Sequence, residues 1–263
     1  MMKEIKIELL KDEHVTDKNY FQDHMYITNS RLKLFMDKCS RFFEYTNDNP
    51  LPVTKAMRFG SAFHMLVLEY KEFSKHYAVE PDGIDKRTTL GKNMALKFND
   101  SLKGREAISY KDYSLMQSMN THLKANKHYS LLEDCDEFEK IYLWKNLNQS
   151  ILCKGKLDAI NTKKKYIVDL KTTMNANPSV FSDTIIERKY HMQAAFYCDA
   201  LGYKDYYIYA IEKSKPHCMC VYKISKNMLS EGRKLYTEAI SSFIEYNMDK
   251  SLTDYNDDKI CEI

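Results

Sequence analysis

The chain has 263 residues, of which 44% are hydrophobic and 13% aromatic, enough for one large domain with a sizeable core. Forty Lys and Arg residues against 37 Asp and Glu residues give a net charge of only +3, so bulk charge indicates no partner and any basic binding surface must be local. The longest apolar run, around AFHMLVL, is too short to cross a bilayer, and the start lacks the apolar segment of a signal peptide. We expect a cytoplasmic protein without membrane association, whose seven cysteines are reduced thiols.

The amino-terminal part, residues 1–130, is expected to be mainly helical. Thr54 can cap a helix that runs through KAMRFGSAFHMLVLEYKEFSK. Its apolar residues recur at helical spacing: Phe59, Phe63, Leu66, Val67 and Tyr70. Ser109 is the expected cap of a second helix, through YSLMQSMNTHLKAN, because an acid follows it three residues later.

From Glu137 onwards the pattern predicts strands, in EFEKIYLWKN, SILCKGKLDAI and KYIVDLKTT. A helical segment follows Pro178, and YHMQAAFYCDALG ends on a glycine placed like a C-cap. The strands DYYIYAIEK and HCMCVYKI then precede a last helix at 225–248. This order predicts one α/β domain over 1–263, with a mixed sheet flanked by helices at 137–248 and a flexible polar tail at 250–263.

Two neighbouring strands of this sheet carry charges on one face. Asp169 and Lys171 in YIVDLKTT share a face because strand side chains alternate with a period of two. In SILCKGKLDAI the alternation places Lys154, Lys156 and Asp158 opposite an apolar face of Ile151, Cys153, Leu157 and Ala159. If NTKKK closes a hairpin that pairs Asn161 with Tyr166, Asp158 stands opposite Asp169.

Two opposed carboxylates repel each other, so something positive is expected between Asp158 and Asp169. A hard divalent cation with oxygen ligands is the natural candidate. Lys171, about 6.6 Å along the strand from Asp169, could then hold or deprotonate a water beside the metal. The alternative is a solvated face on which lysines and aspartates form surface ion pairs, because a D-x-K triplet alone recurs by accident.

An ordered set of motifs places these charges in a wider pattern. The segments are ITNSRLKLFMDKCSRFFEY, RFGSAFHMLVLE, DKRTTLGKNMALKF, CKGKLDAI, YIVDLKTT, RKYHMQAAFYCDAL and IEKSKPHCMCVYKI. In this order they resemble the PD-(D/E)xK nuclease superfamily, and within it the RecE-type exonucleases (exonuclease VIII) and their phage relatives. The resemblance covers most of the chain and implies a restriction-endonuclease-like core, a mixed sheet flanked by helices.

The resemblance also implies roles for individual residues. It assigns four groups to the metal: His64, Asp158, Asp169 and the backbone carbonyl of Leu170. Lys171 matches the catalytic lysine, and Gln193 and Tyr197 match a Q-x-x-x-Y element whose members share a helix face. The proline of the superfamily motif is replaced by Leu157, which leaves the acid in place. Without the resemblance, a satisfied histidine between helices is the more common role for His64, and Glu139 is a weak further acid.

The implied activity is Mg²⁺- or Mn²⁺-dependent hydrolysis of linear double-stranded DNA from its ends. The resemblance implies that the 5′-ended strand is degraded without ATP, leaving 3′ tails for recombination in a bacterial host, and the chain contains no G-x-x-x-x-G-K-[ST] phosphate loop. It further implies a homo-oligomeric ring and a single-strand annealing partner of the RecT type. Five cations are candidates for the DNA path, or else ordinary solvated charges: Arg58, Lys86, Arg87, Lys92 and Lys189.

Three other functions remain open at the level of sequence. A structure-specific endonuclease could use the same fold, and a DNA-binding module could retain the fold without catalysis. An Fe-S nuclease of the CRISPR-adaptation type would need a cluster held by four cysteines: Cys39, Cys218, Cys220 and Cys261. The C-x-C spacing argues against a cluster, because both thiols of a strand C-x-C project to the same side.

Overall fold

A computed structural model describes residues 5–11, 14–17, 19–20, 22–85 and 87–255. Within these residues the main sheet runs in the order β1-β5-β6-β7-β8-β9, and a short β2 pairs with β6. The strands are β1 (Ile7–Leu10), β2 (Ile27–Thr28), β5 (Glu137–Asn146), β6 (Ile151–Asn161), β7 (Tyr166–Thr173), β8 (Asp205–Glu212) and β9 (Met219–Lys223). The β7–β8 and β2–β6 pairs are parallel and the others antiparallel, which confirms the predicted mixed sheet.

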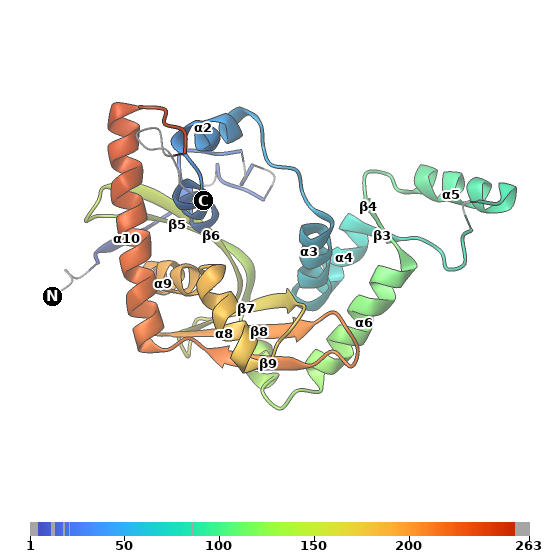
Figure 1. The fold of residues 1–263 in the computed structure, drawn as a ribbon. Helices are drawn as coiled ribbons and strands as arrows, with labels where there is room; N and C mark the ends of the chain where they lie inside the picture. The colour runs from blue at the N-terminus through green and yellow to red at the C-terminus, as the bar shows by residue number, and fades with distance from the viewer. Residues whose placement is uncertain (1–4, 12–13, 18, 21, 86, 256–263) are drawn as a thin grey trace, which may run out of the picture.

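Helices cover both faces of this sheet (Figure 1). On one side lie α1 (Asn29–Asp37), α9 (Tyr190–Leu201) and α10 (Lys226–Asp249), and on the other α3 (Lys55–Leu68) and α6 (Tyr110–Lys124). The remaining helices are α2 (Ser40–Asp48), α4 (Tyr70–His76), α5 (Thr89–Ser101), α7 (Ser130–Glu133) and α8 (Pro178–Glu187). Helix α5 projects from the body beyond a small parallel pair, β3 (Tyr77–Val79) and β4 (Glu106–Ile108).

The helix boundaries follow the capping residues. The hydroxyl of Thr54 accepts a hydrogen bond from Met57 N (3.2 Å), and that of Ser109 accepts one from Asp112 N (3.0 Å). These caps satisfy amide groups that have no partner inside the helix. At the other end of α9, Gly202 adopts the left-handed conformation at φ 67°. The predicted starts of α3 and α6 and the predicted end of α9 are therefore confirmed.

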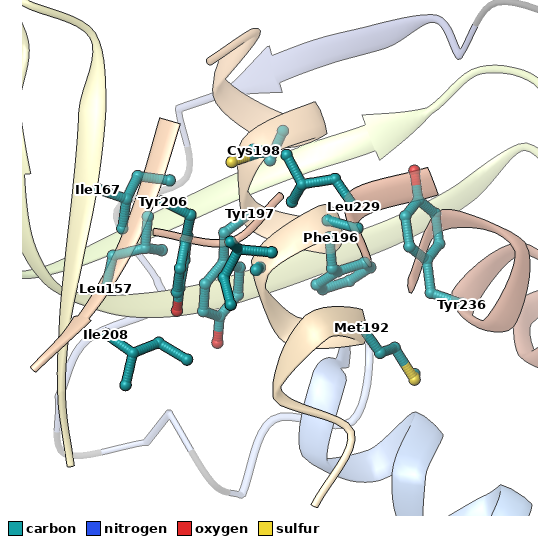
Figure 2. Packing of buried hydrophobic residues seen from close by; sticks show 14 of the residues in the cluster. Leu157, Ile167, Met192, Phe196, Tyr197, Cys198, Tyr206, Ile208, Leu229 and Tyr236 are labelled. Atoms are coloured by element: carbon teal, nitrogen blue, oxygen red, sulfur yellow. The ribbon is translucent and has the colours of Figure 1, made fainter. Parts of the chain in front are cut away.

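The larger core lies between the sheet and helices α9 and α10 (Figure 2). Trp144 of β5, Phe196 of α9 and Tyr236 of α10 are almost fully buried and their rings are in contact. Gly232 allows the closest approach of the two helices, because a Cβ at this position would overlap the carbonyl of His191. Helix α9 is therefore held tightly, and its position on the sheet is fixed by apolar packing.

Two predictions about side-chain faces are wrong. The helix that begins at Lys55 ends at Leu68, because Glu69 leaves helical geometry (φ −131°, ψ 49°), and Tyr70 starts a new helix with 66% of its surface exposed. Ala159 does not share a face with Cys153 and Leu157 but packs against α3 and α6.

The switch of faces occurs where the β5–β6 pairing is interrupted. The paired residues pass from Phe138↔Ala159 to Lys140↔Leu157, and the intervening Glu139 has φ 47°. A left-handed residue in a strand rotates the backbone, so the alternation of side chains shifts by one on both strands. The interruption falls at Glu139 of β5 and Asp158 of β6, two acidic residues that would otherwise face each other across the two strands.

The two ends of the described chain pack on the sheet and on α2. Lys154 is 1% exposed, and its ammonium donates to the carbonyl of Asp23 (2.6 Å), which fastens the segment before β2 to β6. Near the other terminus, Thr253 N donates to the hydroxyl of Ser40 (2.7 Å). Residues 256–263 of the predicted tail lie outside the described residues. In the part of the chain that the structure describes, no helix has the length and apolar character needed to span a membrane.

Candidate active site

Strands β6 and β7 separate at the point where their acids meet. Their pairing runs from Asn161↔Tyr166 to Ala159↔Val168 and ends there, so the predicted register is confirmed and Asp158 faces Asp169 across the opening fork. Leu170 N, freed from β6 by the separation, donates instead to Asp158 Oδ2 at 2.8 Å. The Asp158 carboxylate therefore lies between the two strands rather than on an outer face of the sheet.

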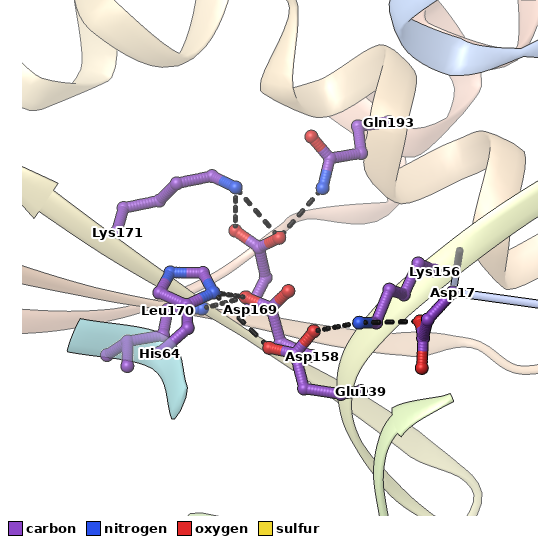
Figure 3. Close-up of polar contacts among 9 residues, drawn as sticks. All are labelled: Asp17, His64, Glu139, Lys156, Asp158, Asp169, Leu170, Lys171 and Gln193. Atoms are coloured by element: carbon purple, nitrogen blue, oxygen red, sulfur yellow. Dashed lines mark hydrogen bonds and ion pairs between the residues drawn. The ribbon is translucent and has the colours of Figure 1, made fainter. Parts of the chain in front are cut away.

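Asp169 is 3% exposed, and its carboxylate accepts hydrogen bonds from two side chains (Figure 3). The ammonium of Lys171 is 2.9 Å from Oδ1 and 2.7 Å from Oδ2, and Gln193 Nε2 of α9 donates to Oδ1 at 2.7 Å. Gln193 is itself positioned by the hydroxyl of Tyr206 on β8, at 3.2 Å. Helix α9 thus brings an amide to the second acid of the fork.

His64 approaches the fork from the opposite helical layer. Its Nδ1 lies 3.5 Å from Asp158 Oδ2 and 3.6 Å from Glu139 Oε1. Glu139 reaches this position from β5, at the left-handed residue where the β5–β6 pairing is interrupted. The histidine therefore lies beside one carboxylate from each of two neighbouring strands.

A lysine on β6 holds the outer side of Glu139. The ammonium of Lys156 lies 3.2 Å from Glu139 Oε2 and 2.9 Å from Asp17 Oδ1, so it bridges the site to the segment before β2 (Figure 3). The Asp17 side chain is well exposed whereas that of Glu139 is not. The bridge leaves Oε1, the other oxygen of Glu139, directed to the His64 side.

The charges of the site shift one another's protonation. Burial disfavours the charged imidazole of His64, but Asp158 and Glu139 outweigh burial and raise its pKa to about 9. Burial also raises the pKa of Asp158, to about 6, against the opposing effect of His64. Glu139 has a lowered pKa, because its contacts with His64 and Lys156 outweigh its burial.

Lys171 carries a stable positive charge in the site. Burial disfavours its charge, but the carboxylates of Asp169 and Asp158 outweigh burial and hold its pKa above the usual range. Lys171 therefore keeps its proton near neutral pH and acts as a donor and a positive charge.

The donor set fits a divalent cation. One ligand atom each from His64, Glu139 and Asp158 lie within 4.8 Å of one another. Glu139 Oε1 and Asp169 Oδ2 are buried and accept no hydrogen bond within the described residues, although the ammonium of Lys171 lies 2.7 Å from the latter. Buried carboxylate oxygens without donors are costly, and oxygen-rich sites of this kind suit Mg²⁺ or Mn²⁺.

Residues 28–261 match the family model described as "PDDEXK-like domain of unknown function (DUF3799)". The chain belongs to this PDDEXK-like family. A crystal structure of a "putative exonuclease" from Eubacterium rectale is similar in fold, with 13% identity, a TM-score of 0.65 and 95% of both chains covered. No curated protein matches the sequence.

Most residues predicted for the site of this PDDEXK-like domain come together. His64, Asp158, Asp169, Lys171 and Gln193 gather around the fork. The sixth side chain, Tyr197, is buried in the core behind it. Its ring packs on β6 at Gly155, where a Cβ would overlap the ring, which explains the glycine of the CKGKLDAI motif. The metal role of the Leu170 carbonyl stays a prediction.

The five cations predicted for the DNA path are dispersed. Arg58 lies 3.9 Å from Glu106, Arg87 is paired with Asp85, and Lys189 is paired with Asp37. Lys92 is exposed on α5, away from the fork. Lys86 lies outside the described residues, as does Cys261 of the four cysteines considered for a cluster. A DNA path through these residues stays a prediction.

Two residues of the site have no functional role in the sequence-based prediction. The strand pattern assigns Lys156 only to a charged face and gives no role to Asp17. The alternation of SILCKGKLDAI does place Lys156 on the face of Asp158, and this was the available signal. Asp17 had none, because its contact with Lys156 joins segments that are remote in sequence.

Proposed function

We propose that this PDDEXK-like domain is a metal-dependent, ATP-independent exodeoxyribonuclease of the RecE type. The observation that carries the proposal is the fork itself, in which Asp158 and Asp169 face each other with Lys171 bonded to the second acid. The similarity in fold to the E. rectale protein described as a "putative exonuclease" is consistent with the same class of activity. The proposed substrate of the present chain is the end of linear double-stranded DNA.

The cation would be held by His64, Glu139 and Asp158, whose ligand atoms lie within 4.8 Å of one another. Asp169 and the Leu170 carbonyl are the further ligands that the sequence resemblance implies. A bound Mg²⁺ or Mn²⁺ would supply Lewis-acid polarisation of the scissile phosphate and a lower pKa for the attacking water. Asp158 and Glu139 raise the pKa of His64 to about 9 in the metal-free site, so His64 would have to release a proton in order to serve as a ligand.

Lys171 and Gln193 act on the substrate side of Asp169. The ammonium of Lys171 offsets the negative charge that develops on the phosphate and orients the attacking water. Gln193, bonded to both Asp169 and Tyr206, keeps the carboxylate in one rotamer, so its geometry is set before substrate binds. Lys171 does not serve as the general base in this arrangement, because its pKa is raised.

We further propose that the enzyme degrades the 5′-ended strand and leaves a 3′ single strand for recombination. A homo-oligomeric ring around the duplex would explain processive digestion, and a RecT-type annealing protein is the proposed partner for the 3′ strand. These three proposals rest on the sequence resemblance to RecE-type exonucleases. Light scattering of the purified chain tests the ring, and co-purification tests the partner.

The deciding experiment is a time course on linear duplex labelled at its 5′ ends, with Mg²⁺ and with EDTA. The proposal predicts early release of 5′ label with Mg²⁺ and none with EDTA. Release only after the 3′ ends have been consumed contradicts the strand polarity. A closed circular duplex of the same sequence serves as control, and its cleavage at a comparable rate would identify an endonuclease instead.

A further inference from the structure

A group of cations lies beside the candidate active site, on the side of α1 and the start of α9. Tyr190 is at its centre: the ammonium of Lys171 lies 5.1 Å from the centre of the Tyr190 ring, and that of Lys33 lies 5.9 Å from it. Lys189 and Arg188 immediately precede Tyr190 in the chain. The cluster thus begins at the catalytic lysine and extends away from Asp169.

Lys33 differs from the other lysines of this cluster. Lys171 is paired with Asp169, and Lys189 with Asp37 at 2.6 Å. Within the described residues Lys33 makes no ion pair, although it is half-buried on α1. The ring of Tyr190 is the partner that the structure gives it, and an aromatic face compensates only part of the hydration that a buried ammonium loses.

The electrostatic surroundings of Lys33 are unfavourable for a cation. Burial lowers its pKa, and the charges of Lys171, Lys189 and Arg188 lower it further, whereas Asp37 alone acts in the opposite direction. Lys171 and Lys189 are each paired with a carboxylate, whereas Lys33 has no such partner within the described residues. A half-buried ammonium in this position costs free energy unless an anion binds nearby.

We propose that Lys33, with Lys189 and Arg188 beside it, is the anchor for a second phosphate group of the DNA strand bound at the fork. This inference rests on the proposed nuclease function and extends it. Phosphate contacts fix the register of a protein on a nucleic acid, so Lys33 would hold the strand next to the phosphate that is cut. Lys33 is a binding residue rather than a catalytic one, because it contacts neither the fork acids nor their cation.

The ring of Tyr190 sets the geometry of the anchor. It starts helix α9, which also carries Gln193 to Asp169. Because α9 is fixed by its packing on α10, Tyr190 and Gln193 are held on one rigid element, and through them α9 contacts both Lys33 of α1 and Asp169 of β7. The strand therefore meets two cation-bearing subsites at a fixed separation, which favours one register of the scissile phosphate.

The test compares Lys33→Ala with Lys33→Arg and with Lys38→Ala, an exposed lysine just after α1. Losing one charge-assisted contact to phosphate should raise KM for linear duplex about tenfold and leave kcat within about twofold, because the contact is equal in ground and transition states. Arginine should restore KM, and Lys38→Ala should leave it unchanged. Lys33→Ala should also reduce the slope of log Kd against log salt by about one charge.

Substrates with 5′-phosphate and 5′-hydroxyl ends identify the source of the phosphate. A rise in KM confined to 5′-phosphorylated ends assigns the anchor to the terminal phosphate, and an equal rise on both assigns it to an internal phosphodiester. If KM and the salt slope are unchanged in Lys33→Ala, the anchor proposal is wrong. The nuclease proposal would still hold in that case, provided that the wild type cleaves DNA. If the wild type cuts no DNA, anisotropy with a labelled duplex still reports whether Lys33→Ala weakens binding, so the two failures are distinguishable.

Discussion

Strand β6 contributes to two regions that are built on different principles. From Cys153 to Leu157 it lies in the apolar core under α9 and α10, where its alternate side chains pack against neighbours on every side. At Asp158, one residue later, its pairing with both neighbouring strands is interrupted and its side chain joins a cluster of buried charges. The core region is stabilised by burial, whereas the charged region holds buried carboxylate oxygens without hydrogen-bond donors at an energetic cost.

Helix α9 contributes side chains to both the apolar core and the charged fork. On one side Phe196 contacts Trp144 and Tyr236 in the core, and on the other Gln193 reaches Asp169. Packing of the apolar side determines where the helix lies, and this position places Gln193 within hydrogen-bonding distance of Asp169. Substitutions in the two regions should therefore separate: changes at the fork reduce activity at little cost in stability, and changes in the core do the reverse.

The largest separation is expected for Asp169→Asn. It removes a ligand charge while keeping the shape of the side chain, so kcat/KM for linear duplex should fall on the order of 10³-fold. The amide oxygen can still accept from Lys171 and Gln193, but the amide nitrogen cannot replace the second oxygen beside Lys171, so some loss of stability is expected and kcat/KM is compared per folded molecule. Asp183→Asn, at an exposed acid on α8, is the control. Full activity in Asp169→Asn would remove the fork from the mechanism.

The opposite pattern is expected for Ile240→Ala on α10. Ile240 is fully buried in the core, and truncation of such a side chain costs about 2–5 kcal/mol of the free energy of unfolding. Urea denaturation should show this loss, while kcat/KM per folded molecule stays near the wild-type value. Ile186→Ala, at an exposed isoleucine, should change stability by less than 1 kcal/mol. An equal loss in both variants would show that the core does not support the sheet as described.

A smaller effect is expected where the two regions are linked, at Lys156. Lys156→Met removes the ammonium that holds Glu139 and keeps the length of the side chain. Loss of a group that orients a metal ligand typically weakens metal binding 10- to 100-fold, and calorimetric titration with Mn²⁺ should detect it. Lys140→Met, at an exposed lysine on β5, is the matched control. Unchanged Mn²⁺ affinity in Lys156→Met would mean that Glu139 needs no such support.

The smallest effects should come from glycines. Gly155→Ala places a methyl group against the ring of Tyr197 and should cost about 1–3 kcal/mol of unfolding free energy. Gly60→Ala, in helix α3 with open space around it, should instead stabilise the protein by about 1 kcal/mol. Thermal unfolding of the two variants checks both signs. A stable Gly155→Ala variant would argue against the close packing of α9 on β6.

Much of the fork could be predicted from sequence, because its information is local. The period of two placed Asp169 and Lys171 on one face, and the short hairpin fixed Asn161 opposite Tyr166 and therefore Asp158 opposite Asp169. The helices followed from caps such as Thr54 and Ser109. The resemblance to a known nuclease superfamily supplied His64 and Gln193, which no local pattern would have connected to the fork.

The remainder depends on tertiary context. The left-handed conformation of Glu139 carries no sequence signal, since a glutamate rarely adopts it, and without it the face of Ala159 could not be foreseen. The pairing of Lys156 with Asp17 and the approach of Lys33 to Tyr190 join distant segments. Such contacts follow from the packing of whole helices and loops, which a periodicity analysis does not reach.

The central claim is that the fork between β6 and β7 is a divalent-metal centre. Calorimetric titration of the wild type and of Asp158→Asn with Mn²⁺, at constant pH and salt, tests it most directly. Binding to the wild type should be saturable, with at least a 100-fold weaker affinity in Asp158→Asn and wild-type affinity in Asp183→Asn. Equal affinity in Asp158→Asn and the wild type, or no binding to either, would show that the fork is not a metal centre.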